Sequence, residues 1–123
     1  MSRVVHFEIP AKDPEKVVAF YTTVFGWEIK KWDGPQDYWL VTTGKEGEPG
    51  IDGAIYSPNE MMSQVVNTIG VASVDDFMAK VKAGGGRTLT EKMSVPGVGY
   101  LAYCADPEGN MFGIFQDNPG AGQ

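Results

Sequence analysis

The only histidine of the chain, His6, stands two residues before an acidic residue, Glu8. Imidazole changes charge near neutral pH and a carboxylate accepts or releases a proton, so the pair could transfer protons to and from a bound molecule. In an extended segment, residues two apart share a face and lie about 6.5 Å apart. We therefore take His6 and Glu8 as candidate catalytic residues. Two other interpretations of His6 stay open: a ligand contact without catalysis, and a histidine that only bonds a neighbour or solvent.

Metal and cysteine chemistry is restricted by composition. The chain has one His and one Cys, so a zinc site with several His or Cys ligands cannot be assembled within one chain. A metal would need carboxylates or a second chain. Cys104 cannot form an intrachain disulfide, which suits a reducing compartment. We expect no resident cofactor.

The elements that position His6 follow from residue patterns. Val4 to Ile9 alternates, with apolar Val5, Phe7 and Ile9 on one face and His6 and Glu8 on the other. A helix is predicted from Asp13, a capping residue followed by proline, to about Phe25, before Gly26. Its expected buried face consists of Val17, Phe20, Tyr21, Val24 and Phe25. Three strands are expected next, over 26–32, 37–43 and 51–57.

The second half repeats this order of elements. A strand is expected over 65–71, a helix over 73–83 with Val74, Phe77, Met78 and Val81 on one face, and strands over 87–95, 98–105 and 110–116. Both halves therefore read as strand, helix, strand, strand, strand. The pattern predicts an α+β protein built from two βαβββ modules.

Three motifs on this doubled pattern give a family resemblance. They are Val4-Val5-His6-Phe7-Glu8-Ile9-Pro10, Phe20-Tyr21-x-x-Val24-Phe25-Gly26-Trp27, and Asp106-Pro107-Glu108-Gly109-Asn110 before an apolar strand. With them the chain resembles the vicinal oxygen chelate superfamily, which includes glyoxalases, bleomycin-resistance proteins and extradiol dioxygenases. The resemblance implies one cup-shaped mixed β-sheet with helices outside. It also implies a single domain over 1–116, with modules at about 3–58 and 64–116. A flexible tail is expected over 117–123.

The resemblance also implies where a metal would bind. Metal-dependent members send one ligand from each of four strands, and His6 matches the first position. Val66 and Gly113 stand at two others, and valine and glycine side chains offer a metal nothing. The segment 53–57 contains no acid, His or Cys, and Asp52 lies outside the expected place. The chain is expected to lack the family's metal centre.

The expected function is the binding of a small apolar or aromatic molecule in the cup. Strand alternation and aromatic content suggest a mostly apolar lining with a few polar groups. The candidate ligand-binding residues are Trp39, Tyr56, Thr68, Tyr100, Met111 and Phe115. The alternative is a glyoxalase-like lyase or isomerase, or a dioxygenase-like enzyme, that uses His6 with an atypical metal or acid–base site.

Charge and hydropathy bear on partners. Sixteen acidic against ten basic residues give a net charge of −6 without a basic cluster, which disfavours nucleic acid. Apolar runs such as 17–21 are far shorter than the ~20 residues of a membrane span, and no secretory signal is visible. We expect a cytoplasmic protein. The family resemblance implies a homodimer.

Overall fold

The computed structural model describes residues 2–122, which form two compact units. The N-terminal unit comprises residues 6–66. The C-terminal unit comprises residues 67–122 together with residues 2–5, so the start of the chain belongs with its second half. Among the residues described, no helix is long and apolar enough to cross a membrane.

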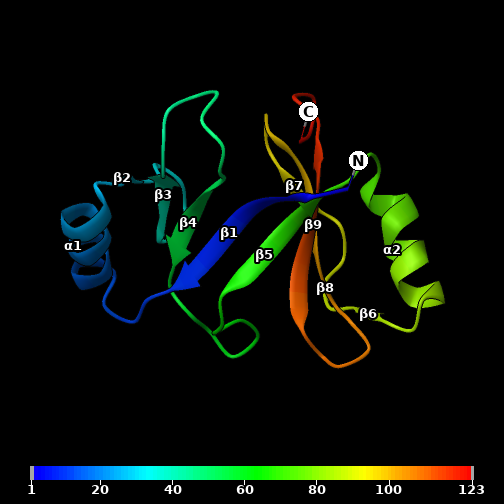
Figure 1. The fold of residues 1–123 in the computed structure, drawn as a ribbon. Helices are drawn as coiled ribbons and strands as arrows, with labels where there is room; N and C mark the ends of the chain where they lie inside the picture. The colour runs from blue at the N-terminus through cyan, green and yellow to red at the C-terminus, as the bar shows by residue number, and fades with distance from the viewer. Residues whose placement is uncertain (1, 123) are drawn as a thin grey trace. The chain divides into compact units, whose positions relative to one another are not determined.

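The N-terminal unit is a mixed sheet with one helix. Its elements are β1 (Val4–Pro10, the first two residues of which belong to the C-terminal unit), α1 (Pro14–Phe25), β2 (Glu28–Lys31), β3 (Tyr38–Thr42) and β4 (Asp52–Tyr56). The strand order is β2-β3-β4-β1, as can be followed in Figure 1. β1 and β4 run parallel, whereas β2, β3 and β4 are antiparallel neighbours. This unit has the predicted βαβββ order.

Helix α1 begins and ends where the sequence predicts. The Asp13 carboxylate accepts a hydrogen bond from the Lys16 N–H at 3.3 Å, and Pro14 occupies the first turn. Gly26 has φ 72°, a left-handed backbone conformation that residues other than glycine adopt only at a cost in energy. Its N–H donates a hydrogen bond to the Thr22 carbonyl. The capping residues therefore fix the length of α1.

The predicted buried face of α1 is wrong in part. Val17 and Val18 pack against the core residues Ala11, Val41 and Ile55. Three of the side chains expected beside Val17 are more than half exposed: Phe20 (54%), Val24 (53%) and Phe25 (61%). The rings of Phe20 and Phe25 contact each other edge to face, and both contact Tyr21, whose ring stacks on Trp27 with centroids 4.7 Å apart. The helical spacing of apolar residues predicts an apolar face on α1, but it does not predict which edge of that face packs against the sheet.

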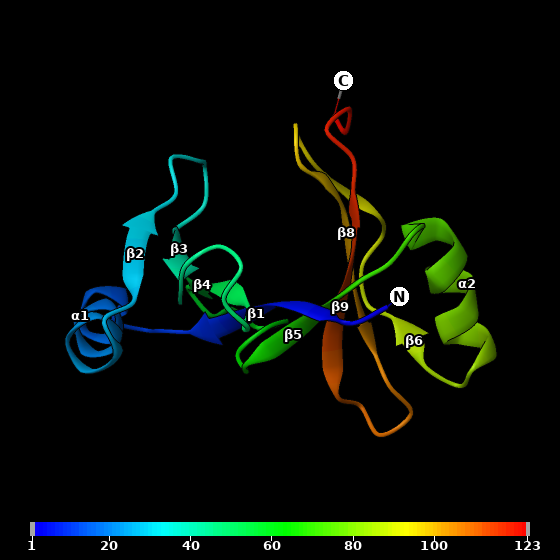
Figure 2. The same ribbon diagram turned by 45° about the horizontal axis from the view of Figure 1, so that its top comes forward.

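The C-terminal unit repeats the arrangement with one addition. Its elements are β5 (Val66–Gly70), α2 (Val74–Ala83), β6 (Arg87–Thr88), β7 (Met93–Val95), β8 (Gly99–Ala105) and β9 (Met111–Asp117). The order is β5-β9-β8-β6, with β7 also paired to β8, and β5 and β9 run parallel. Figure 2 shows α2 alongside β8 and β9. The α+β class and the doubled βαβββ plan are confirmed.

The single strand predicted over 87–95 is two short strands. The N–H groups of Leu89 and Thr90 both donate to the Tyr103 carbonyl, at 2.8 and 3.3 Å, and the Thr90 hydroxyl oxygen accepts from the Tyr103 N–H. Two successive residues thus oppose one on β8, as in a β-bulge, and the regular ladder stops there. The pairing resumes at Met93, which lies opposite Leu101.

Helix α2 has the predicted buried face. The N-cap Ser73 hydroxyl accepts from the Asp76 N–H at 3.2 Å. Val74 is fully buried with Ala102, Cys104 and Ile114, and Phe77, Met78 and Val81 pack against this cluster. The face of the C-terminal sheet that carries Cys104 and Ile114 is therefore the face that α2 covers.

The turn and the end of the C-terminal unit are held by hydrogen bonds. Asp106 accepts from the N–H groups of Glu108 and Asn110 at 2.9 Å, which forms the predicted turn before β9. Residues expected to form a flexible tail contact the turn after β7: Asn118 N–H donates to the Val98 carbonyl, and Ala121, fully buried, accepts from the Gly97 N–H.

Candidate functional site

The sheet of the N-terminal unit has one face toward α1 and one face away from it. Phe7, Ile9, Val41 and Ile55 pack in the α1 core, so their strand neighbours point to the opposite face. The pairing register puts His6 beside Asp52 and Glu8 beside Ala54 on that face. We call this surface the His6 face. On it lie His6, Glu8, Tyr38, Leu40, Asp52, Ala54 and Tyr56.

A tyrosine from β3 reaches the histidine of β1 across the strand between them. His6 Nε2 and Tyr38 Oη are 3.1 Å apart. Ala54 of β4 lies opposite Glu8 on one side and Leu40 on the other. Because alanine carries only a methyl group, Ala54 leaves space above β4 in which the side chains of His6 and Tyr38 meet.

Glu8 is an acidic side chain in a nearly closed environment. It is only 4% exposed, and it forms a side-chain hydrogen bond with Tyr38. Burial and the negative charge of Glu8 both raise the pKa of Tyr38, so its hydroxyl stays protonated. The Tyr38 hydroxyl therefore joins His6 and Glu8 in one hydrogen-bonded group.

The imidazole of His6 is neutral at physiological pH. Burial lowers the pKa of His6, and the carboxylate of Asp52, which would raise it, does not compensate. The Tyr38 hydroxyl has one proton, which it donates to the Glu8 carboxylate, so His6 Nε2–H donates to Tyr38 Oη. The neutral ring can then accept a proton at Nδ1 at pH 7, which is the property required of a general base.

Tyr56 completes the His6 face at its other end. It lies opposite Tyr38 in the β3–β4 ladder and is 5% exposed. Its hydroxyl donates to the Gln64 carbonyl at 2.7 Å. Burial, followed by the charge of Glu8, raises the pKa of Tyr56. The face thus combines phenol rings with one carboxylate and one imidazole.

The equivalent face of the C-terminal unit is less polar. Phe112 and Ile114 pack toward α2, so Met111, Gly113 and Phe115 point away from it. Thr68 lies opposite Gly113 in the parallel β5–β9 pair, and its hydroxyl oxygen has no hydrogen-bond partner among the residues described. We call this surface the Thr68 face.

Known proteins with similar sequences are described as glyoxylase, lactoylglutathione lyase and bleomycin-resistance-like proteins. A family model described as "Bleomycin resistance protein-like N-terminal" matches residues 3–44. A putative glyoxylase, CFP32, of Mycobacterium tuberculosis is 28% identical over 91% of this chain, which spans 43% of that relative's length. A probable lactoylglutathione lyase of Vibrio parahaemolyticus is 26% identical over 94% of this chain and 91% of its own.

Solved structures share the fold over the whole chain. A methylmalonyl-CoA epimerase of Streptomyces coelicolor aligns over 100% of this chain and 99% of its own, with a TM-score of 0.74 and 17% identity. A glyoxalase/bleomycin resistance protein/dioxygenase superfamily member from Vibrio splendidus aligns over 95% and 100%, with a TM-score of 0.67 and 22% identity. These similarities support the membership of this chain in the vicinal oxygen chelate superfamily. The resemblance drawn from the three motifs is confirmed.

The metal centre of the superfamily does not fit the residues of this member. His6 occupies the first ligand position, but its Nε2 already contacts Tyr38. Val66 and Gly113, at two other positions, have no donor atom in their side chains. Within residues 2–122 no three His, Cys, Asp or Glu side chains form a group that could hold a metal ion. We derive no chemistry through a metal.

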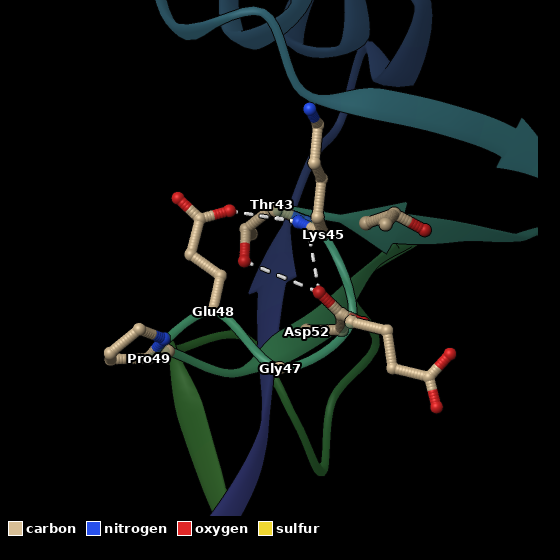
Figure 3. Close-up of a pocket in the computed structure, with 10 residues that line it drawn as sticks. Thr43, Lys45, Gly47, Glu48, Pro49 and Asp52 are labelled. Atoms are coloured by element: carbon tan, nitrogen blue, oxygen red, sulfur yellow. Dashed lines mark hydrogen bonds between the residues drawn. The ribbon is translucent and has the colours of Figure 1, made fainter.

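A hollow of about 500 Å³ lies elsewhere in this superfamily member, at the loop between β3 and β4. Figure 3 shows its walls, which belong to the end of β3, to that loop and to Asp52 at the start of β4. The loop bonds to itself: Thr43 N–H donates to Asp52 Oδ1 at 2.9 Å, and Lys45 N–H donates to Glu48 Oε1 at 2.9 Å. Asp52 is shared by the hollow and the His6 face, whereas none of the site residues predicted from the sequence lines the hollow.

The structure divides the candidate ligand-binding residues. Tyr56 shares a face with His6 and Glu8, and Met111 and Phe115 share one with Thr68. Two placements are wrong. Trp39 lies opposite Ile55 and packs in the α1 core, and Tyr100 packs against the α2 core, with the Lys92 Nζ 4.8 Å from its ring centroid. Each strand alternates, so an error of one residue moves a side chain to the other face.

Sequence reasoning missed Tyr38 as a site residue. The signal was present in β3, where Trp39 and Val41 are the apolar pair that matches a buried face. Tyr38, one position earlier, must then point away from α1. Its contact with His6 still depends on the order of β1, β4 and β3, which the sequence does not give.

Proposed function

We propose that this superfamily member binds a small molecule with an apolar or aromatic body on the His6 face, without a metal ion. The observation that carries the proposal is the hydrogen-bonded group of His6, Tyr38 and Glu8 beside the phenol of Tyr56. A few fixed polar groups among rings and aliphatic side chains are the usual composition of a small-molecule site. Leu40, 44% exposed, supplies the aliphatic part.

The polar group would set the orientation of the ligand. The neutral His6 can accept one hydrogen bond at Nδ1, and the Glu8 carboxylate can also accept. A ligand with a hydroxyl or an amine near its ring could bond to both. A buried carboxylate favours a ligand that donates hydrogen bonds or carries a positive charge, since this offsets the loss of water around the charge.

A second candidate function is proton transfer by an enzyme. It is favoured by the neutral state of His6 and by the link from His6 through Tyr38 to Glu8. Two substrates to test follow from the proteins that this chain resembles: lactoylglutathione and methylmalonyl-CoA. Turnover that falls on the order of 10²-fold or more in His6→Gln, with the fold intact, would support catalysis over binding alone.

The test of the binding proposal is a thermal-shift screen in buffer with EDTA. The probes are phenols and aromatic amines, with the matched compounds lacking the polar group. Binding at 100 times the dissociation constant stabilises the fold by about 2.7 kcal/mol, which is readily measured. We expect the shift to shrink in Tyr38→Phe and His6→Gln and to persist in Tyr21→Phe, which alters a tyrosine of α1. Shifts that require added metal, or that are equal in all variants, would contradict the proposal.

The homodimer and the cytoplasmic location stay predictions. The exposed apolar side chains of α1, Phe20, Val24 and Phe25, support the homodimer, because large apolar patches are uncommon on monomers. Sizing chromatography with light scattering on the full chain and on Phe25→Ser tests it. A mass of one chain at micromolar concentration for the unaltered protein would contradict it.

A further inference from the structure

The Thr68 hydroxyl is a buried polar group without a hydrogen bond. Thr68 is 3% exposed, and its Oγ1 atom has no partner among the residues described. A hydroxyl taken from water without a new partner destabilises a folded protein, and native chains keep few such groups. A valine would fill nearly the same volume without this penalty. The Thr68 hydroxyl therefore needs a hydrogen-bond partner that the folded chain does not itself provide.

Gly113 makes room for that hydroxyl. It lies opposite Thr68 in the β5–β9 pair, and a Cβ atom at position 113 would stand 2.6 Å from Thr68 Oγ1. This is shorter than any normal contact between a side-chain carbon and an oxygen. Threonine is branched at Cβ and has few alternative rotamers, so it could not easily turn away. Because Gly113 has no Cβ atom, the Thr68 hydroxyl has room to lie over β9.

The side chains around this position on the Thr68 face are Met111 and Phe115 of β9 and Tyr103, which lies opposite Gly113 on β8. Met111 and Phe115 flank Gly113 on the same strand and the same face, and both are half-buried. Neither side chain offers a strong hydrogen-bonding atom. Because Met111 and Phe115 are partly exposed, a ligand that approaches from the solvent can contact them. The Thr68 hydroxyl thus lies between the ring of Phe115 and the thioether of Met111. Ligand sites usually have such a lining, mostly apolar with a few polar groups.

We propose that the Thr68 hydroxyl donates a hydrogen bond to an acceptor oxygen of a small aromatic ligand, with Met111 and Phe115 in contact with its apolar part. The inference rests on the proposed small-molecule function and extends it to the C-terminal unit. It also specifies the ligand chemistry: an aromatic ketone, aldehyde or related compound with a carbonyl-type oxygen. In the ligand-free protein the hydroxyl is retained at a cost to stability.

The first arm of the test needs no ligand. Denaturant unfolding is compared for the unaltered chain, Thr68→Val and Thr68→Ser. Thr68→Val removes the hydroxyl and keeps the shape, so we expect its unfolding midpoint to be higher than that of the unaltered chain. Thr68→Ser keeps the hydroxyl and loses a methyl group, so its midpoint should be lower. A lower midpoint for Thr68→Val would show that the hydroxyl has a partner in the free protein, such as a water, and would overturn the inference.

The second arm uses acetophenone and ethylbenzene, which differ by one carbonyl oxygen, with calorimetry as the readout. The unaltered chain should bind acetophenone more tightly, by about 3- to 10-fold, the value of one net hydrogen bond. Thr68→Val should bind the two equally, and Thr68→Ser should keep the preference. Binding of both probes without a preference would overturn this inference and leave the proposed function standing. Binding of neither probe would overturn the ligand class, whereas the proposed function is decided by the phenol and amine screen.

Discussion

His6 Nε2 and Tyr38 Oη lie 3.1 Å apart, although the two residues are 32 positions apart in the sequence. They come from strands that are not neighbours, with β4 between them. The contact ties the only histidine of the chain to Glu8, because the same hydroxyl bonds that carboxylate. Any role of His6 in binding or proton transfer therefore involves Tyr38.

The stability of the protein should depend on the protonation of His6. Burial lowers the pKa of His6 from its ordinary 6.5. Between the lowered pKa of the folded state and about 6.5, the unfolded chain binds more protons, so the free energy of unfolding rises with pH. Above about 6.5 both states are neutral at this position and the contribution is constant.

Urea unfolding of the unaltered chain and of His6→Gln at a series of pH values measures this dependence. The acidic side chains are the same in both proteins, so the difference between the two profiles isolates His6. We expect the unaltered chain to lose stability relative to His6→Gln as pH falls below about 6.5, and the two profiles to run parallel above it. Profiles that also run parallel below this pH would contradict the lowered pKa.

Tyr38→Phe should destabilise the fold by about 1–3 kcal/mol, because it removes one bonding partner from His6 and one from the buried carboxylate of Glu8. Tyr21→Phe is the matched control. It keeps the ring that stacks on Trp27, and a change within about 0.5 kcal/mol is expected. Equal effects of the two substitutions in chemical denaturation would argue against a special role of the Tyr38 hydroxyl.

Gly113→Ala should lower the free energy of unfolding by about 1–3 kcal/mol, because the new methyl group would overlap Thr68 Oγ1. Thr68→Ala removes that oxygen. In a double-mutant cycle, Thr68→Ala should lower the free energy of unfolding less in the Gly113→Ala background than in the unaltered chain. Additive costs would mean that residues 68 and 113 do not meet as the structure has them.

Removal of divalent metals should leave the protein unchanged. Val66 and Gly113 cannot ligate, and among residues 2–122 no group of acidic, His or Cys side chains could hold a metal ion. Tag-free protein dialysed against EDTA should keep its unfolding temperature and its response to the phenol probes. Stoichiometric Zn, Ni, Mn or Fe that survives dialysis, measured by mass spectrometry, would contradict this prediction.

The local elements were accessible from the sequence because their causes are local. Asp13, Pro14 and Gly26 set the ends of α1 through bonds and dihedral angles within a few residues. The alternation of β1 put His6 and Glu8 on one face, and the α1 core confirms it. The three motifs and the doubled order of elements were sufficient for the superfamily.

The tertiary structure decided which residues meet. Trp39 and Tyr100 were chosen as site residues and lie on the helix-covered faces, whereas Tyr38 was passed over and contacts His6. The break between β6 and β7 also depends on two N–H groups that share one carbonyl of β8. Alternation fixes faces within a strand, but the register between strands depends on pairing across the sheet. The contact of His6 with Tyr38 and the unsatisfied Thr68 hydroxyl over Gly113 are products of that register, and no local pattern specifies it.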